Sequence, residues 1–377
     1  HHTEHDGNCG YVPATEGAPC GYVCEICNAE GDGETAAPSD TEKAVTALEQ
    51  LLYGTATPSN AVMPLADYNG PAIVMGTDHL EGGQASSVYF GRYQQTSVGE
   101  NAPGEGTEGV DWIYSNTAKY KEQGPYYLKD PVKWRVLFNN VSGQLFLLSD
   151  QNLDVKRYHD DFEEVTWEKS TVRSWLNGYG SSENNGGDYG KDYANDNFID
   201  NAFSEAEQGA IAETTVNNDG GSDTNDKIFL LSTEEVKNSD YGFTEDASRK
   251  TTNTAFVTGG GQNGSEIMGT DDFWWLRTSH PDNAAKAICV APWGGLDDGG
   301  AFVHGDNIVV RPAFNLNPDA VLFTSAAAGG KDDAAVDSDL TTVGTGTGEW
   351  KLTLKDDSRT FNVTSNTTVS IEQGKTA

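Results

Sequence analysis

Alternating apolar and polar residues recur along the chain from about residue 84 and predict a series of short strands. The segments SSVYFGRYQ and VKWRVLF have the period of two that is typical of strands with one buried face. GQLFLLSD predicts a further strand, which begins after a turn at Ser142 and Gly143, and KIFLL is a shorter run of the same kind. This pattern indicates a structure rich in sheet.

Helical spacing of apolar residues is confined to short segments. In EKSTVRSWLNG, Val172, Trp175 and Leu176 fall on one face, and Gly178 is placed to end the helix. Two later segments begin with a capping box, a serine followed three residues later by a glutamate: Ser204 with Glu207, and Ser232 with Glu235. Helices this few and short cannot cover a parallel sheet, which disfavours a doubly wound α/β fold and favours α+β.

The segments on either side of the strand-rich region divide the chain into four parts. Residues 1–30 form a module rich in cysteine and histidine, and residues 31–83 hold an acidic linker and an amphipathic helix. The main domain is predicted at 84–320. Residues 321–377 begin as a linker and continue with the hairpin pattern GEWKLTLKDDSRTFNVT. We expect this hairpin to open an immunoglobulin-like β module that continues past Ala377, or to dock elsewhere as a strand pair.

Charge restricts the partners of the protein. The 377 residues include 24 Lys and Arg against 58 Asp and Glu, a formal net charge of −34. Such a surface repels nucleic-acid phosphates and anionic membranes, and leaves neutral glycans, peptides or cationic surfaces. No apolar run of about 18 residues or more predicts a membrane span. Because the chain begins with His1 rather than Met, we expect a processed product that has lost an export signal, hence a secreted or cell-wall-associated protein.

Four of the five cysteines crowd the first 30 residues. Thiolates and imidazoles are the usual ligands of a tetrahedral zinc site, and the module offers them at Cys9, Cys20, Cys24, Cys27 and His5. In an oxidising exterior the same four cysteines would instead form two disulfides, and both alternatives stay open. Cys289 stands apart in the alternating stretch AAKAICVA and is predicted to be a small core residue.

The acidic stretch NNGGDYGKDYANDNFIDN offers oxygen ligands for calcium at Asp188, Asp192, Asp196 and Asp200. It lacks the Asp-x-Asp-x-Asp-Gly order and the closing glutamate of a calcium-binding loop. A solvated insertion is therefore the alternative to a calcium site.

The sequence predicts that some tryptophans are buried in the core and that others lie at the surface. Four of them lie within apolar patterns and are predicted core residues: Trp134, Trp167, Trp175 and Trp274. Strand geometry sends Trp274 and Trp275 to opposite faces, so we expect one of the two to be less buried. Trp293 instead lies in a polar, glycine-rich loop, where an indole is a platform for a sugar ring or a peptide, unless it packs at the edge of the core.

Eight motifs follow one another between residues 84 and 320: FGRYQ, VKWRVL, LLSD, TWEKSTVRSWLN, NAFSEAEQGAI, DKIFLLSTEE, WWLRT and VVRPAFNLN. In this order and spacing the chain resembles a family of uncharacterised bacterial extracellular domains. That family is similar to the C-type-lectin-like superfamily, on the branch of the formylglycine-generating enzymes. The resemblance implies a mixed sheet with two short helices beneath a face of long loops. It also implies that Arg277 and Arg311 brace the scaffold through buried polar bonds.

By the same resemblance, the loops after residue 280 would face a ligand. We therefore predict a ligand-binding protein of the adhesin type, without a catalytic residue, that recognises a glycan or a protein. Stacking on Trp293 would be joined by hydrogen bonds from polar residues near it in the sequence: His280, Asp282, Asn283, Asp297, Asp298, His304, Asp306 and Asn307.

Two other functions stay open. The C-terminal strand pair would suit a structural subunit of a surface fibre or layer, because an unpaired strand can complete a neighbour's sheet. A metal-dependent oxidase of the same fold is the other. Copper-binding relatives use two cysteines where this domain has only Cys289, and iron-dependent relatives use three histidines, for which the candidates are His159, His280 and His304.

Overall fold

Two main β-sheets organise the residues that the computed structural model describes, which are 73–104, 106–115, 125–140, 143–180, 192–262, 269, 271–327, 340 and 348–355. Within these residues the larger sheet runs in the order β1 (Ile73–Met75), β16 (Val321–Ala326), β17 (Glu349–Leu354), β2 (Ser87–Gly99), β4 (Tyr126–Asn140), β5 (Gln144–Ser149), β15 (Ala313–Leu316) and β10 (Ile228–Phe229). Two short strands pair beside this path, β3 (Trp112–Tyr114) on β4 and β7 (Ile211–Ala212) on β15.

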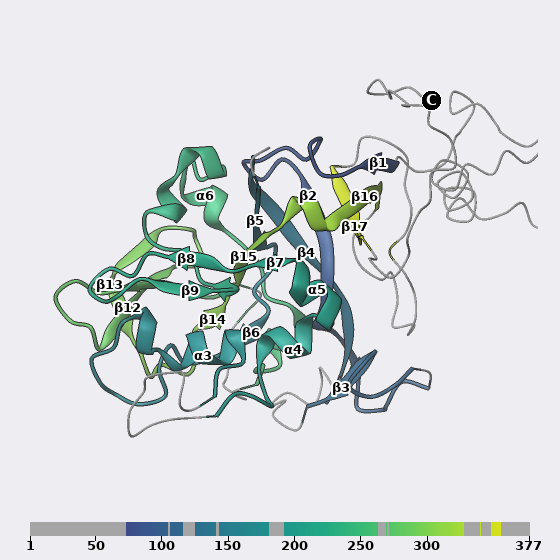
Figure 1. The fold of residues 1–377 in the computed structure, drawn as a ribbon. Coiled ribbons are helices and arrows are strands. Elements are labelled where there is room, and N and C mark those ends of the chain that lie inside the picture. The colour runs from purple at the N-terminus through teal and green to yellow at the C-terminus, as the bar shows by residue number, and fades with distance from the viewer. Residues whose placement is uncertain are drawn as a thin grey trace, which may run out of the picture. The chain divides into compact units, whose positions relative to one another are not determined.

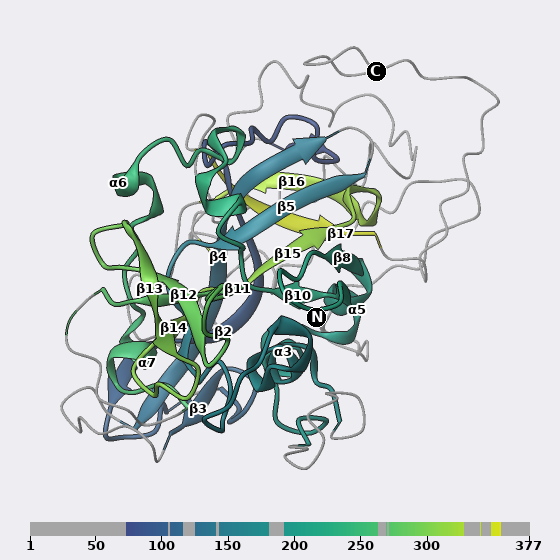
Figure 2. The ribbon, with the colours of Figure 1, turned by 90° about the vertical axis from the view of Figure 1, so that its left-hand side faces the viewer.

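The smaller sheet has the order β13 (Leu296–Phe302), β12 (Lys286–Val290), β11 (Trp274–Ser279), β14 (Val309–Val310) and β6 (Asp154–Val155). Its strands pair antiparallel except for β11 with β14, which are parallel. Figures 1 and 2 show β12 and β13 on one side of the molecule and β16 and β17 of the larger sheet on the other. A separate two-stranded ribbon is formed by β8 (Thr214–Val216) and β9 (Thr224–Asp226).

Helices in the described residues are short. The α-helices are α3 (Thr171–Asn177), α4 (Phe198–Ala202), α5 (Glu205–Ala210), α6 (Asp246–Arg249) and α7 (Ala255–Thr258). Single 3₁₀ turns are η3 (Trp167–Lys169), η5 (Glu235–Lys237), η6 (Ser239–Tyr241) and η7 (Pro318–Ala320). The fold is thus mixed, with mostly sheet and few helices, which is compatible with the predicted α+β class. None of these helices has the length and apolar character needed to span a membrane.

The predicted helix at 168–178 is confirmed as η3 and α3, and its boundaries follow from local signals. Ser170 caps the N-terminus by accepting a hydrogen bond from the Arg173 backbone N–H, and Gly178 ends the helix in the left-handed region at φ 71°. The apolar face, which includes Trp175, is fully buried. Both predicted capping boxes are also present, at Ser204–Glu207 and at Ser232–Glu235, although the second begins only a 3₁₀ turn.

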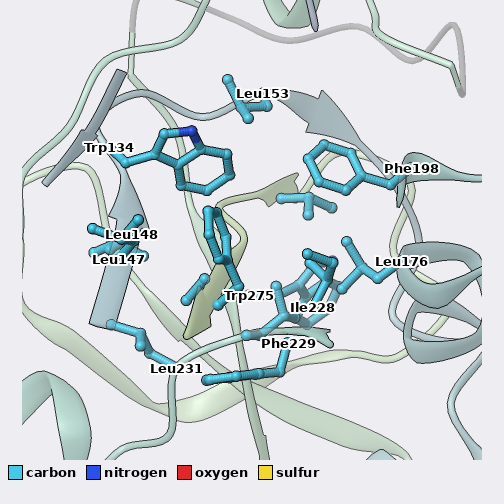
Figure 3. Close-up of a cluster of buried hydrophobic side chains, with 14 of the residues drawn as sticks. Trp134, Leu147, Leu148, Leu153, Leu176, Phe198, Ile228, Phe229, Leu231 and Trp275 are labelled. Atoms are coloured by element: carbon cyan, nitrogen blue, oxygen red, sulfur yellow. The ribbon is translucent and has the colours of Figure 1, made fainter. Parts of the chain in front are cut away.

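The hydrophobic core lies between the sheets and the α3–α4 segment. Figure 3 shows Trp134 from β4 and Trp275 from β11 pointing into one cluster with Phe198, Leu176 and leucines of β5. All four predicted core tryptophans are buried, and Cys289 is buried as expected. Burial of such aromatic side chains supplies most of the favourable free energy of folding.

The expected difference in burial between Trp274 and Trp275 is wrong: their exposed fractions are 1% and 0%. They do occupy opposite faces of β11, but both faces are covered. The Arg311 guanidinium lies 5.0 Å from the centroid of the Trp274 ring. The Trp275 ring lies 5.6 Å from that of Tyr158, and its indole N–H donates to a backbone carbonyl at 2.9 Å.

Arg277 and Arg311 have the scaffold contacts that the resemblance implied. Arg277 donates to the carbonyl of Leu230 at 2.8 Å and to the Glu235 carboxylate at 3.0 Å. Arg311 is fully buried and donates to the carbonyls of Ser149 (2.9 Å) and Arg249 (3.1 Å). Each guanidinium therefore ties a sheet to a loop through groups that would otherwise be buried without a partner.

The predicted domain boundary at 320 does not coincide with the end of the sheet. We expected 321–377 to be a linker followed by a hairpin that either opens a separate β module or docks elsewhere as a strand pair. β16 and β17 both belong to the larger sheet, so the first hairpin strand docks there. β17 pairs antiparallel with β16 and parallel with β2, so it is hydrogen-bonded along both edges. This pairing removes β17 as the free strand on which the fibre or layer hypothesis rested. The alternation in EWKLTL indicated a strand, but not which strands would be its neighbours.

Several predictions fall outside the described residues. They are the cysteine and histidine module at 1–30, the linker and helix within 31–72, and the second half of the C-terminal hairpin. Zinc or disulfides at Cys9, Cys20, Cys24, Cys27 and His5, and an immunoglobulin-like module, stay predictions.

Candidate ligand-binding face

The β12–β13 hairpin separates the predicted ligand-binding residues into two groups. Lys286 pairs with Phe302 at one end of the hairpin, and Val290 pairs with Leu296 at the other. His280, Asp282, Asn283, His304, Asp306 and Asn307 therefore belong to the first end, whereas Trp293 is in the turn at the second. Asp297 and Asp298 lie between, on the outer strand β13. The hairpin thus places the predicted residues at two separate ends, and their part in ligand binding stays a prediction.

Three segments meet at the first end: residues 157–165, 280–286 and 302–307, which we call the three-loop face. Backbone hydrogen bonds join them. His159 N–H donates to the Val303 carbonyl at 2.8 Å, and Val303 N–H donates to that of Ala285 at 3.0 Å. Val165 N–H donates to the Ala284 carbonyl at 3.0 Å. Segments more than 100 residues apart in the chain are thereby fixed side by side.

Exposed aromatic side chains contact one another on the three-loop face. Phe162 is 62% exposed and Phe302 is 46% exposed, and their ring centroids are 5.4 Å apart. The His304 ring lies 4.9 Å from Phe162 and 6.0 Å from Phe302. The Lys286 ammonium lies 5.1 Å from the centroid of Phe302 and donates to the Gly299 carbonyl. Single exposed apolar residues are common, but clustered ones mark a surface that another molecule covers.

Acidic residues outnumber basic ones in the three segments that carry this aromatic cluster. The three segments contain six acidic side chains and two basic ones, Arg157 and Lys286. Asp306 lies 3.9 Å from the Arg157 guanidinium, and both are substantially exposed. The Nδ1 atom of His304 is buried and makes no hydrogen bond within the described residues. The face therefore presents acceptors and aromatic rings, and its negative charge disfavours an anionic ligand.

His280 and Asn283, two of the predicted ligand-binding residues, make hydrogen bonds within their own loop. The His280 ring accepts the Asp282 N–H at 3.2 Å, and the Asn283 side-chain oxygen accepts the Ala285 N–H at 3.1 Å. These bonds fix the turn between β11 and β12. Asp282 and Asn307 are exposed beside them and are free to meet a ligand.

Trp293, at the opposite end, is 61% exposed and contacts Phe273 edge-on, with ring centroids 5.9 Å apart. The turn that carries it is held against α6, which Figure 2 shows at that end of β13. Gly294 has φ +89°, and a Cβ there would lie 1.8 Å from the Asp246 carbonyl oxygen, so only glycine fits. Trp293 is thus both an edge residue of the core and an exposed indole.

Two of the predicted calcium ligands, Asp192 and Asp200, accept hydrogen bonds within the protein. Asp192 accepts the Ala194 N–H, and Asp200 accepts hydrogen bonds from the Asn197 and Gln208 amides. Asp188 lies outside the described residues, so the calcium site stays a prediction. Within the described residues, no three His, Cys, Asp or Glu side chains are grouped to hold a metal ion, and this includes His159, His280 and His304. Burial also raises the pKa of the Cys289 thiol, which opposes its ionisation to a metal ligand.

Sequence reasoning missed Phe162 and Phe302, the most exposed members of the aromatic cluster. Phe162 interrupts the acidic run HDDFEEV, which is a signal that could have been noticed, because a lone aromatic in a charged loop has no core to enter. Phe302 ends a strand pattern and gave no signal. Their contact joins residues 140 positions apart in the chain.

A family model described as "Domain of unknown function (DUF6273)" matches residues 142–318. The matched range contains all three segments of the three-loop face and the whole β12–β13 hairpin. It leaves out β1, β2, β3, β4, β16 and β17. No curated protein and no solved structure is significantly similar to the chain.

Proposed function

We propose that the protein is a secreted or cell-surface bacterial protein of the adhesin type, which binds an extracellular glycan or protein on the three-loop face of a C-type-lectin-like domain. The observation that carries this proposal is the contact of Phe162, Phe302 and His304 on a solvent-exposed surface. Exposed aromatic rings that already contact one another lose little side-chain entropy when a partner packs on them.

The surroundings of the cluster favour a neutral or cationic ligand. Aromatic rings pack against the apolar faces of sugar rings or against aliphatic side chains. The exposed carboxylates of Asp282 and Asp306 accept hydrogen bonds from hydroxyl or amine groups. This binding requires neither calcium nor a chemical step.

Binding of the full chain to an array of neutral glycans and mucin-type glycoproteins, with and without a chelator, tests the proposal. We expect a chelator-resistant signal that Phe162→Ala abolishes. Tyr114→Ala is the matched control, because Tyr114 is a 50% exposed aromatic residue on β3, far along the chain from the three-loop face. A signal that survives Phe162→Ala but is lost in Trp293→Ala would move the site to the opposite end of the hairpin.

A further inference from the structure

Lys286 places a cation on the aromatic cluster of the three-loop face. Its ammonium lies 5.1 Å from the centroid of the Phe302 ring and donates a hydrogen bond to the Gly299 carbonyl at 3.0 Å. That carbonyl belongs to a bulge of β13, in which residues 298–300 lie opposite the single residue Ile288. The face of an aromatic ring carries partial negative charge and attracts ammonium and guanidinium groups. The fold itself therefore shows which kind of group the Phe302 ring attracts.

The Phe162 ring beside it is exposed and holds no such cation. Among the residues that the structure describes, no lysine or arginine lies over this ring. Phe162 is 62% exposed, and its ring contacts are those with Phe302 and His304. A positively charged side chain from outside can therefore reach it.

Carboxylates close to these rings in the sequence favour a positively charged partner. Asp161 directly precedes Phe162, and Asp306 follows His304 by two residues. Asp306 lies 3.9 Å from the Arg157 guanidinium, but both side chains are exposed, and exposed ion pairs contribute little free energy. The excess of six acidic over two basic residues in the three segments has the same sign as the net charge of −34. The three-loop face thus complements a cation in charge.

The openness of the face favours a partner with several charges over a single small cation. Small quaternary ammonium ligands are held in cages of aromatic rings. Phe302, by contrast, is 46% exposed, and the rings and carboxylates come from three segments of the chain. A flexible chain with spaced positive charges can contact them at the same time. The aliphatic stems of lysine and arginine also pack on aromatic surfaces.

We propose that the three-loop face binds a flexible protein segment with several lysine or arginine side chains, and that Lys286 competes with them for the Phe302 ring. This proposal rests on the proposed function and selects a protein partner for the same face. Phe162 and Phe302 strengthen binding in this account. Lys286 weakens it, because its ammonium covers one ring and repels an incoming positive charge.

Fluorescence anisotropy with the full chain tests the proposal on labelled peptides of equal length, in which glycine alternates with arginine, glutamine or glutamate. Physiological ionic strength screens the long-range attraction of the acidic chain. We expect saturable binding of the arginine peptide alone. Phe162→Leu keeps the charge but removes the aromatic ring, and it should weaken binding at least about threefold. Tyr114→Leu is the matched control, because Tyr114 is a 50% exposed aromatic residue on β3.

Lys286→Met tests the competition directly. It removes the ammonium from Phe302, and it should strengthen binding of the arginine peptide about threefold. Lys351→Met makes the same change of charge at an exposed residue of β17, on the other side of the molecule (Figure 2), and should leave the affinity unchanged. Thermal unfolding shows that each variant is folded. Equal effects of the two lysine variants would overturn the competition.

The remaining outcomes separate this proposal from the proposed function. A glutamine peptide that binds as tightly as the arginine peptide would overturn the cationic partner. Arginine-peptide binding that is unchanged in Phe162→Leu would overturn the site, because it would reflect net charge alone. Neutral-glycan binding that Phe162→Ala abolishes, without binding of the arginine peptide, would reject this proposal and retain the proposed function. Absence of both kinds of binding would reject both.

Discussion

The two ends of the β12–β13 hairpin present aromatic residues to solvent in different ways. At the three-loop face, Phe162, Phe302 and His304 come from two distant segments and contact one another in the open. At the other end, Trp293 lies against one ring, Phe273, in a turn fixed to α6 by Gly294. Several exposed rings in contact are typical of a surface that binds a partner, whereas a single ring on a tight turn is typical of a residue that covers the edge of the core.

The largest expected effect comes from removing the buried Trp275 side chain of β11, the strand that pairs with β12 of the hairpin. Trp275→Ala would leave a cavity between β11 and the Tyr158 loop, and we expect a loss of about 3–5 kcal/mol in the free energy of unfolding. Urea denaturation measures it. If the two ends share one core, this variant should lose ligand binding and fold stability together. A loss below about 1 kcal/mol would mean that Trp275 is not packed as described.

Asp154 lies on β6, the edge strand of the smaller sheet opposite β13, and its ionisation should change the stability of the whole fold. Burial raises the pKa of Asp154, on β6, to about 6, although its bond to the Tyr93 hydroxyl acts in the opposite direction. Because the folded pKa lies above the unfolded value of about 3.9, the carboxylate destabilises the fold above pH 6, and this cost disappears as the pH falls toward 4. The free energy of unfolding should therefore fall by roughly 3 kcal/mol between pH 4 and a pH above 6 because of this group.

Denaturation of wild type and Asp154→Asn between pH 4 and 7 isolates this contribution. The difference in stability between the two proteins should change across that range, in the direction that makes wild type relatively more stable at the acidic end. A difference that is constant with pH would show that Asp154 does not titrate there.

Gly294→Ala tests the anchoring of the Trp293 end. The new Cβ would overlap the Asp246 carbonyl in a left-handed backbone conformation, so we expect a loss of about 2–3 kcal/mol in unfolding free energy. Tryptophan fluorescence should report the displaced turn. Gly299→Ala is the control on the same hairpin, since its Cβ would approach only the Asp297 side chain, at 3.3 Å. Equal stability of the two variants would contradict the described contact with α6.

Phe302→Ala tests the three-loop face by its effect on binding. The substitution removes the contacts with Phe162, His304 and Lys286, and we expect about 2 kcal/mol less binding free energy, near a thirtyfold weaker Kd. Isothermal titration with the ligand found on the array measures it. Because Phe302 is 46% exposed, thermal unfolding should change little. Unchanged affinity would leave the aromatic cluster without a role in binding.

Trp293→Ala should have the smallest effect. With 61% of the residue exposed and one ring contact, we expect a stability loss below about 0.5 kcal/mol and no change in affinity at the three-loop face. The same titration and unfolding experiments check both. A large loss of affinity would reverse the comparison between the two ends.

Local signals in the sequence were sufficient for elements whose boundaries depend on near neighbours. Ser170 and Gly178 mark the ends of α3, and the Ser204–Glu207 capping box begins α5, because caps act within a single turn. Alternation likewise located β4 and β5. Burial of four tryptophans and of Cys289 followed from their apolar surroundings.

The mixed, sheet-rich character, the short capped helices and much of the core could be predicted from the sequence, because they depend on patterns a few residues long. Three features became visible only in the folded protein: β17 pairs with β2, both faces of β11 are covered, and the predicted binding residues lie at two ends of a hairpin. The tertiary structure also brought Phe162 to Phe302. Strand partners and loop contacts depend on packing between segments that are distant in the sequence. Hydrophobic burial stabilises any complementary surface, whatever the separation of its residues along the chain.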